Sequence, residues 1–130
     1  MNRCAAVVAA LCVAALACPS QAQAQSPRKF TAQTLRGELI VTNPPEVLLN
    51  RQPARLAPGA RIRGADNLLV LSGALVGRSA VVHYTFDTQG NLLDIWVLNA
   101  AERSNHPWPV TLQQAAGWAF NPDTQTWSRP

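Results

Sequence analysis

The chain has 130 residues and a mass of 14.0 kDa, which leaves room for one domain and one hydrophobic core. A multidomain enzyme and a multispanning membrane protein are therefore excluded. The chain carries 11 Lys and Arg residues against 7 Asp and Glu residues, and this net charge of +4 is by itself too small to indicate binding to a polyanion.

The first 24 residues have the pattern of an export signal. Arg3 precedes a run of 13 apolar residues, 5–17, which is followed by Pro19 and by Ala22-Gln23-Ala24 at the cleavage positions. Such a run reaches about 20 Å, too short for the roughly 30 Å hydrocarbon layer. We predict a helical signal peptide over residues 1–24 and a periplasmic or secreted protein without a transmembrane segment, the alternative being a buried N-terminal helix.

A second interpretation of the leader is a bacterial lipobox. Ala15-Leu16-Ala17-Cys18 would leave Cys18 lipidated and the protein anchored to a membrane, although the pattern prefers Leu at the position of Ala15. All three cysteines, Cys4, Cys12 and Cys18, lie in the leader. A mature protein beginning at Gln25 therefore has no disulfide, no cysteine-based zinc site and no cysteine nucleophile.

The remaining residues predict a flexible lead-in over 25–36 and a single β-rich domain over 37–130. Removal of Arg3 leaves 10 basic and 7 acidic residues there, a net charge of +3. Short apolar runs alternate with turn residues, which is typical of an all-β domain. Asn43-Pro44-Pro45 should end a strand at 39–41, because proline lacks an amide donor, and Pro58-Gly59 should turn the chain before 60–63.

The middle of the chain supplies the longest apolar run. Leu68-Leu69-Val70-Leu71 predicts a strand covered on both faces. Ser72-Gly73 predicts a bulge, after which the strand would continue to Val76. A helix over 68–76 is the alternative.

Residues 80–86 and 92–98 predict a hairpin around a loop at 87–91. Both faces of this hairpin carry large apolar side chains, which a single exposed sheet would leave in water. We therefore predict a small barrel-like or sandwich sheet, because closure gives every strand an inner face.

The C-terminal part predicts a loop over 100–109, one short helix and a second hairpin. Thr111 and Gln114 fit a capping box for a helix that ends at Gly117. Residues 118–120 and 126–127 flank a turn that contains Pro122. With a two-residue loop, Trp118 and Trp127 would face each other across the strands.

The stretch from Arg55 to Leu98 contains RLAPGARIR, NLLVLSGALVG, VVHYTFD and DIWVL. It resembles a set of small exported proteins of Gram-negative bacteria, and the closing WAFNPDTQTW is similar to their ends. The resemblance implies export and an intact fold. Those proteins have no assigned activity, so it brings no catalytic residues with it.

Catalytic patterns are sparse. The serines lie in no Gly-x-Ser-x-Gly elbow, and the spacing of His83 and His106 fits no metal motif, so we predict no metal or other cofactor. We interpret His83 as a half-exposed strand residue and His106 as a loop residue in water. Asp87 and Asp94 could serve as the paired acids of a glycan hydrolase, but turn formation and an ion pair with Arg explain them better.

Arginine is the more informative excess. Arg51, Arg55, Arg61 and Arg63 lie within thirteen residues that contain no acid, and Arg61 and Arg63 would share one strand face. Guanidinium groups bind phosphate and carboxylate in a bidentate manner, although a solvated sheet face that discourages edge pairing is the alternative. Trp108, between two prolines, is the tryptophan that we expect to be most exposed.

We therefore predict a periplasmic, non-enzymatic binding or accessory module. Its partner would be an envelope protein or an anionic envelope component, with no role for nucleic acid, and the binding residues would be Arg51, Arg55, Arg61, Arg63 and Trp108. The alternatives are a cell-wall glycan hydrolase that uses Asp87 or Asp94 with Trp108 as a sugar platform, and an accessory of outer-membrane assembly.

Overall fold

The structure is a computed structural model that describes residues 26–130. The predicted signal peptide and the alternative lipid site at Cys18 lie outside the described residues. Within residues 26–130, every helix is too short or too polar to cross a bilayer.

The described chain is mainly β-structure with short helical segments. In chain order, the elements are β1 Leu35–Asn43, β2 Glu46–Leu49, β3 Gln52–Arg63, the 3-10 helix η1 Ser72–Leu75, β4 Ser79–Phe86, β5 Leu92–Val97, α1 Ala100–Ser104, α2 Leu112–Gly117, β6 Ala119–Asn121 and β7 Thr126–Ser128.

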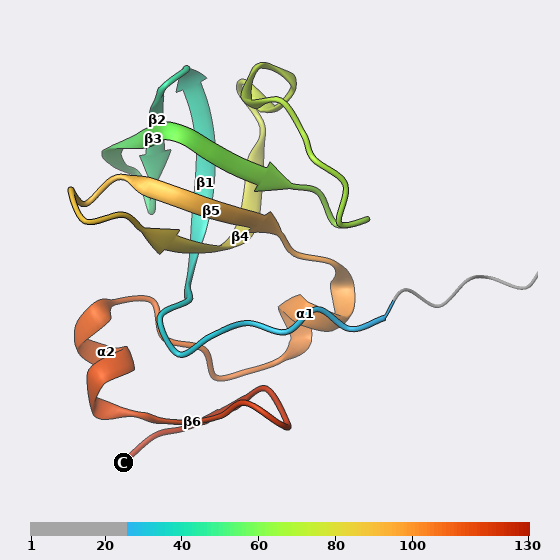
Figure 1. Cartoon of the computed structure of the whole chain (residues 1–130), viewed down its shortest axis with the longest axis vertical. Helices are drawn as coiled ribbons and strands as arrows, with labels where there is room; N and C mark the ends of the chain where they lie inside the picture. Colours follow the sequence, from blue (N-terminus) through green and yellow to red (C-terminus); the bar gives the residue numbers. More distant parts are fainter. Residues whose placement is uncertain (1–25) are drawn as a thin grey trace, which may run out of the picture.

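Within residues 26–130, the first five strands close into a barrel in the order β1-β2-β3-β5-β4 (Figure 1). β3 and β5 pair in parallel, and the other neighbours are antiparallel. This is the strand order of the OB-fold barrel, an architecture that hosts many unrelated functions. Of the two predicted architectures, the barrel is the one that forms.

β3 is longer than the sequence predicts, because Pro58-Gly59 bends the strand and does not end it. Gly59 has a φ of +78°, and the pairing with β5 shifts register between Leu56 and Arg61. The first part of β3 pairs with β2 and the last part with β5. The bend therefore lets one strand serve two neighbours around the barrel.

The β4–β5 hairpin is confirmed. Val82 pairs with Val97 and Tyr84 with Ile95, and all four side chains are at least half-buried. The Asp87 side chain accepts hydrogen bonds from the backbone N–H groups of Gln89 (2.8 Å) and Asn91 (2.9 Å). Its role as a turn former is therefore confirmed.

The strand predicted over 68–71 is wrong. Residues 64–78 form a loop that contains η1 and runs along one side of the barrel (Figure 1). The apolar run suggested a buried strand. The residues around it favour turns instead, and Asn67 and Gly77 both adopt a positive φ, which a regular strand does not allow.

The C-terminal part follows the prediction, with one addition. The helix after Thr111 is confirmed, and the Thr111 hydroxyl accepts a hydrogen bond from the Gln114 N–H (3.1 Å). Residues 100–104 form a further helix, α1, in place of the predicted loop. Its complete capping box joins Asn99 and Glu102.

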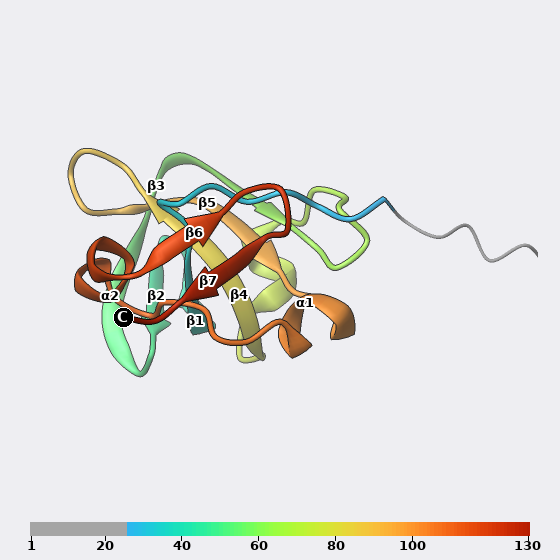
Figure 2. The same cartoon turned by 90° about the horizontal axis from the view of Figure 1, so that it is seen from below.

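The terminal hairpin β6–β7 is confirmed and crosses one end of the barrel (Figure 2). The aromatic side chain directly opposite Trp127 is Phe120. Trp118 precedes β6 and contacts Trp127 from the side, with ring centroids 6.5 Å apart. The predicted face-to-face tryptophan pair therefore does not form, because four residues separate β6 and β7.

Buried side chains of the described residues form two clusters. The larger fills the barrel and includes Leu35, Leu39, Val82 and Ile95. The second lies outside the barrel wall and contains Phe30, Leu98, Trp108 and Trp127. The second cluster exists because residues 26–34, α1, α2 and the β6–β7 hairpin form a layer across one end of the barrel (Figures 1 and 2).

Residues 26–34, expected to be a flexible lead-in, are held against this layer. Phe30 is buried, and its backbone N–H donates to Gln125 Oε1 (2.7 Å). Arg28 forms an ion pair with Glu102 and donates to the carbonyls of Gly64 (2.9 Å) and Val97 (2.8 Å). The segment therefore joins the barrel to the second layer.

Candidate functional site

The four predicted arginines are distributed along β3 and the turn before it, and they do not converge. Arg55 forms an ion pair with Glu46 on β2 (3.3 Å), and Arg61 forms one with Asp94 on β5 (3.2 Å). The ion-pair interpretation of Asp94 is therefore confirmed. Arg51 lies in the β2–β3 turn, at the opposite end of β3 from Arg63.

The most exposed apolar surface lies in residues 64–77, which we call the leucine loop. Leu68, Leu69 and Leu71 are 66%, 70% and 84% exposed, and Val76 is exposed as well. Isolated apolar side chains are common on protein surfaces, but three leucines within four residues are not. Such a surface is typical of an interaction site.

The leucine loop is fixed to the barrel and not frayed from it. Val70 and Leu75 pack against the barrel core. The N–H of Val70 donates to the carbonyl of Ile62 (2.8 Å), and the N–H of Gly77 donates to that of Val41 (2.9 Å). Val70 and Leu75 turn toward the barrel. The neighbouring leucines, Leu68, Leu69 and Leu71, therefore face water.

Two arginines flank the leucine loop in the sequence. Arg63 forms a bridge with Leu69 in antiparallel register, a geometry that places the two side chains on the same face. Arg78 follows the loop directly and is exposed. Among residues 26–130, neither guanidinium has an ion-pair or hydrogen-bond partner. The leucine loop with Arg63 and Arg78 therefore combines exposed leucines with two arginines and one carboxylate, Asp66, which gives a net charge of +1.

The prediction that Trp108 is exposed is wrong, because only 5% of its surface is accessible to solvent. Its indole N–H donates to the carbonyl of Thr34 (2.9 Å), and its ring packs against Trp127 and Phe30. The flanking prolines suggested an open loop, but they hold the ring in the second cluster. Trp108 is therefore not a platform for a ligand.

His83 is also buried, at 1% exposure, where the sequence analysis expected a half-exposed residue. It points out of the barrel, but the second layer covers it: its ring stacks on Trp108 (centroids 4.2 Å apart) and meets the edge of Phe30 (4.4 Å). His106 is exposed, as predicted.

Arg36 fixes the protonation state of His83. Its Nε and Nη2 lie 3.2 and 3.1 Å from His83 Nε2, and its other N–H groups donate to the carbonyls of Asn105 and Glu102. A guanidinium can only donate, so His83 Nε2 accepts and the neutral ring carries its proton on Nδ1. Burial, and then the charges of Arg36 and Arg28, lower the pKa of His83 from 6.5 to about 2.

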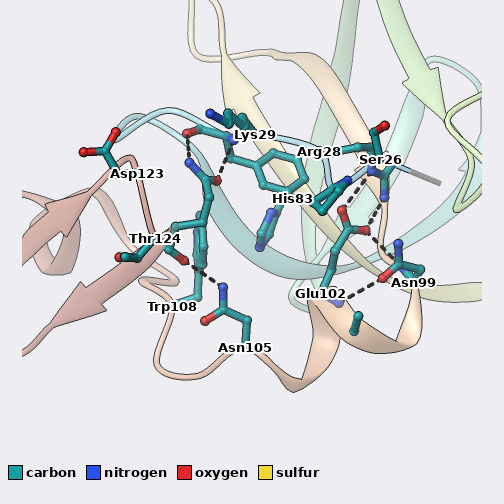
Figure 3. Close-up of a pocket in the computed structure, with 14 residues that line it drawn as sticks. Ser26, Arg28, Lys29, His83, Asn99, Glu102, Asn105, Trp108, Asp123 and Thr124 are labelled. Atoms are coloured by element: carbon teal, nitrogen blue, oxygen red, sulfur yellow. Dashed lines mark hydrogen bonds and ion pairs between the residues drawn. The ribbon is translucent and has the colours of Figure 1, made fainter. Parts of the chain in front are cut away.

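A cavity of about 480 Å³ lies between residues 26–30, α1 and the β6–β7 turn. Figure 3 shows His83, Glu102, Ser26 and Thr124 among its lining residues. An imidazole, a carboxylate and hydroxyls are the groups of a nucleophilic triad. Here, however, Arg28 and the Asn99 N–H occupy Glu102, and His83 accepts from Arg36.

The imidazole of His83 and the carboxylate of Glu102 are therefore committed to structural bonds. The lowered pKa keeps His83 from taking up a proton near neutral pH, which a general base must do. Across residues 26–130, no three His, Cys, Asp or Glu side chains lie close enough together to hold a metal ion.

The buried His83 predicts a pH-dependent stability. Below about pH 6.5 the unfolded chain binds a proton at this residue that the folded chain does not, so the free energy of unfolding should fall as the pH falls. The slope is about 1.4 kcal/mol per pH unit, or about 2 kcal/mol between pH 6.5 and pH 5. Urea unfolding followed by circular dichroism from about pH 7.5 to about pH 5 measures it.

The two histidines provide a matched pair for this measurement. His83→Gln should flatten the slope, whereas His106→Gln should leave it unchanged. Equal slopes in the wild-type protein and His83→Gln would show that His83 is not the group responsible.

Comparison of the chain with protein-family models, with curated proteins and with solved structures found no match.

Proposed function

We propose that this chain is an exported, non-enzymatic accessory module that binds an anionic component of the cell envelope. The binding surface is the leucine loop together with Arg63 and Arg78. The predicted signal peptide and the resemblance to small exported proteins support export. The commitment of His83, Glu102, Asp87 and Asp94 to structural bonds supports a role without catalysis.

The observation that carries the proposal is the exposure of Leu68, Leu69 and Leu71 on a loop flanked by Arg63 and Arg78, whose guanidinium groups have no ion-pair or hydrogen-bond partner among residues 26–130. Burying a leucine side chain contributes about 1.5 to 3 kcal/mol. A fixed loop can use this energy without first losing conformational entropy, because its backbone is already ordered. The guanidinium groups add attraction to phosphate or carboxylate and orient the contact.

The proposed surface contains only one of the four arginines predicted from the sequence, Arg63. It also contains Arg78, which was not among the predicted residues. Arg55 and Arg61 already have acidic partners, and Arg51 lies at the far end of β3.

Sedimentation of the exported protein with isolated envelope membranes tests the proposal. The double substitution Arg63→Glu/Arg78→Glu should reduce binding at least about tenfold, since each cation at an anionic surface contributes about 1 kcal/mol and its reversal adds repulsion. Wild-type binding should also weaken as salt is added.

The control is Arg51→Glu/Arg129→Glu, which changes the net charge equally at two exposed positions elsewhere. This variant should keep most of the wild-type binding. If the two double variants lose binding to the same extent, net charge and not this surface is responsible. If neither loses binding, the proposed surface is wrong.

A further inference from the structure

We propose that the anionic partner is the phospholipid bilayer itself, with the leucines of the loop entering its outer hydrocarbon and Arg63 and Arg78 contacting lipid phosphates. This inference rests on the proposed function and names the partner class for the same surface.

The apolar part of the surface fits lipid better than protein. Protein–protein contacts concentrate their binding energy in aromatic and arginine side chains that fill shaped pockets. The leucine loop has no aromatic residue, and its exposed apolar side chains are aliphatic: Leu68, Leu69, Leu71 and Val76. Acyl chains require no shape complementarity, so a projecting set of leucines suffices.

The charges fit the headgroup region. A guanidinium presents a planar fork of N–H donors that matches a phosphate oxygen pair. Arg63 and Arg78 flank the loop on its two sides in the sequence. The acid within the loop, Asp66, accepts a hydrogen bond from the Leu68 N–H (3.0 Å), and the three charged residues together leave a net charge of +1. Exposed leucines flanked by arginines are typical of interfacial anchors.

The start of the described chain supports the same orientation. The Arg28 side chain, two residues after the start of the described chain, donates to the carbonyl of Gly64, the first residue of the leucine loop (2.9 Å). Figures 1 and 2 both place this start and the tip of the loop on the same side of the molecule. A lipid on Cys18, the alternative to cleavage after Ala24, would hold the leucine loop near the same bilayer, and two weak signals together make stable anchoring.

Vesicle sedimentation tests the inference with pure lipid as the probe. The exported protein is mixed with vesicles of phosphatidylglycerol and phosphatidylethanolamine or with vesicles of phosphatidylcholine alone, and its N-terminus is identified by mass spectrometry. We expect binding to the anionic vesicles to exceed binding to phosphatidylcholine at least about tenfold, because two guanidinium groups each contribute about fivefold or more.

Substitutions then identify the surface. Leu69→Ser/Leu71→Ser should lower binding to anionic vesicles at least about tenfold, because two aliphatic side chains no longer leave water. Leu112→Ser removes a leucine that is 61% exposed on α2, away from the loop, and should leave binding unchanged. A lipid on Cys18 would bind both vesicle types and would be visible in the mass spectrum, so it is distinguished from the loop.

The two binding assays together show which of the two proposals fails. If envelope membranes bind the protein through Arg63 and Arg78 but pure lipid vesicles do not, the proposed function stands and the lipid partner is wrong. If vesicles bind the wild-type protein and Leu69→Ser/Leu71→Ser equally, the leucine loop is not the contact. If neither envelope membranes nor vesicles bind, both proposals are wrong.

Discussion

Replacing Trp108 by alanine should lower the free energy of unfolding by about 3 to 5 kcal/mol, the range for removing a large aromatic side chain from a core. Trp108 contacts His83, Phe30 and Trp127, and its N–H bonds to Thr34. Few other changes in this chain remove so many contacts at once. Urea unfolding followed by circular dichroism measures the loss.

The comparison for this prediction is Trp118→Ala. Trp118 is only half-buried at the edge of the second cluster, so its removal should be clearly less costly. If the two alanine variants are equally stable, Trp108 does not hold the second layer to the barrel. A loss below about 1 kcal/mol for Trp108→Ala would lead to the same conclusion.

Replacing Glu102 by alanine is the second change with a large expected effect, again about 3 to 5 kcal/mol. The Arg28 and Glu102 side chains are 9% and 13% exposed, so the substitution leaves a nearly buried guanidinium without its counter-charge. It also removes the acceptor for the Asn99 N–H at the start of α1 (3.0 Å). The same unfolding assay measures the loss.

A second pair of substitutions isolates the effect of burial. Glu46→Ala breaks the exposed ion pair with Arg55 and should cost less than about 1 kcal/mol. Arg28→Met/Glu102→Leu removes both buried charges and should recover much of the loss, since apolar side chains often replace a buried pair well. If this double variant is no more stable than Glu102→Ala, the uncompensated charge is not the cause.

The sequence pattern was sufficient to predict those elements whose contacts are between residues close together in the sequence. The β4–β5 hairpin, the turn at Asp87 and the helix after Thr111 were predicted because alternation, turn chemistry and capping act within a few residues. The residues Asn99 and Glu102, three apart in the sequence, are the capping-box signal for α1.

Contacts between distant segments could not be predicted in the same way. The parallel pairing of β3 with β5 follows from the bend at Gly59, which alternation does not reveal. His83 alternates outward from the barrel, and only the packing of Phe30 and Trp108 on that outer face buries it.

The candidate site was predicted only in part, for a related reason. The apolar run at Leu68–Leu71 was interpreted as core because apolar residues are usually buried. The turn residues around it, Gly64, Asn67, Gly73 and Gly77, were the available signal that the backbone could not continue as a strand. Without the exposed leucines, the sequence offered no reason to include Arg78 in the proposed surface.

The most direct test of the proposed docking surface is a spin label at position 71, read by electron paramagnetic resonance. Leu71→Cys gives a single label site once the leader and its cysteines are removed, and Leu112→Cys is the matched site on α2. On addition of anionic vesicles, the label at position 71 should lose mobility and become accessible to oxygen but not to a polar relaxation agent, while the label at position 112 should stay in water. A label at position 71 that remains as mobile and as hydrated as the label at 112 would contradict the account.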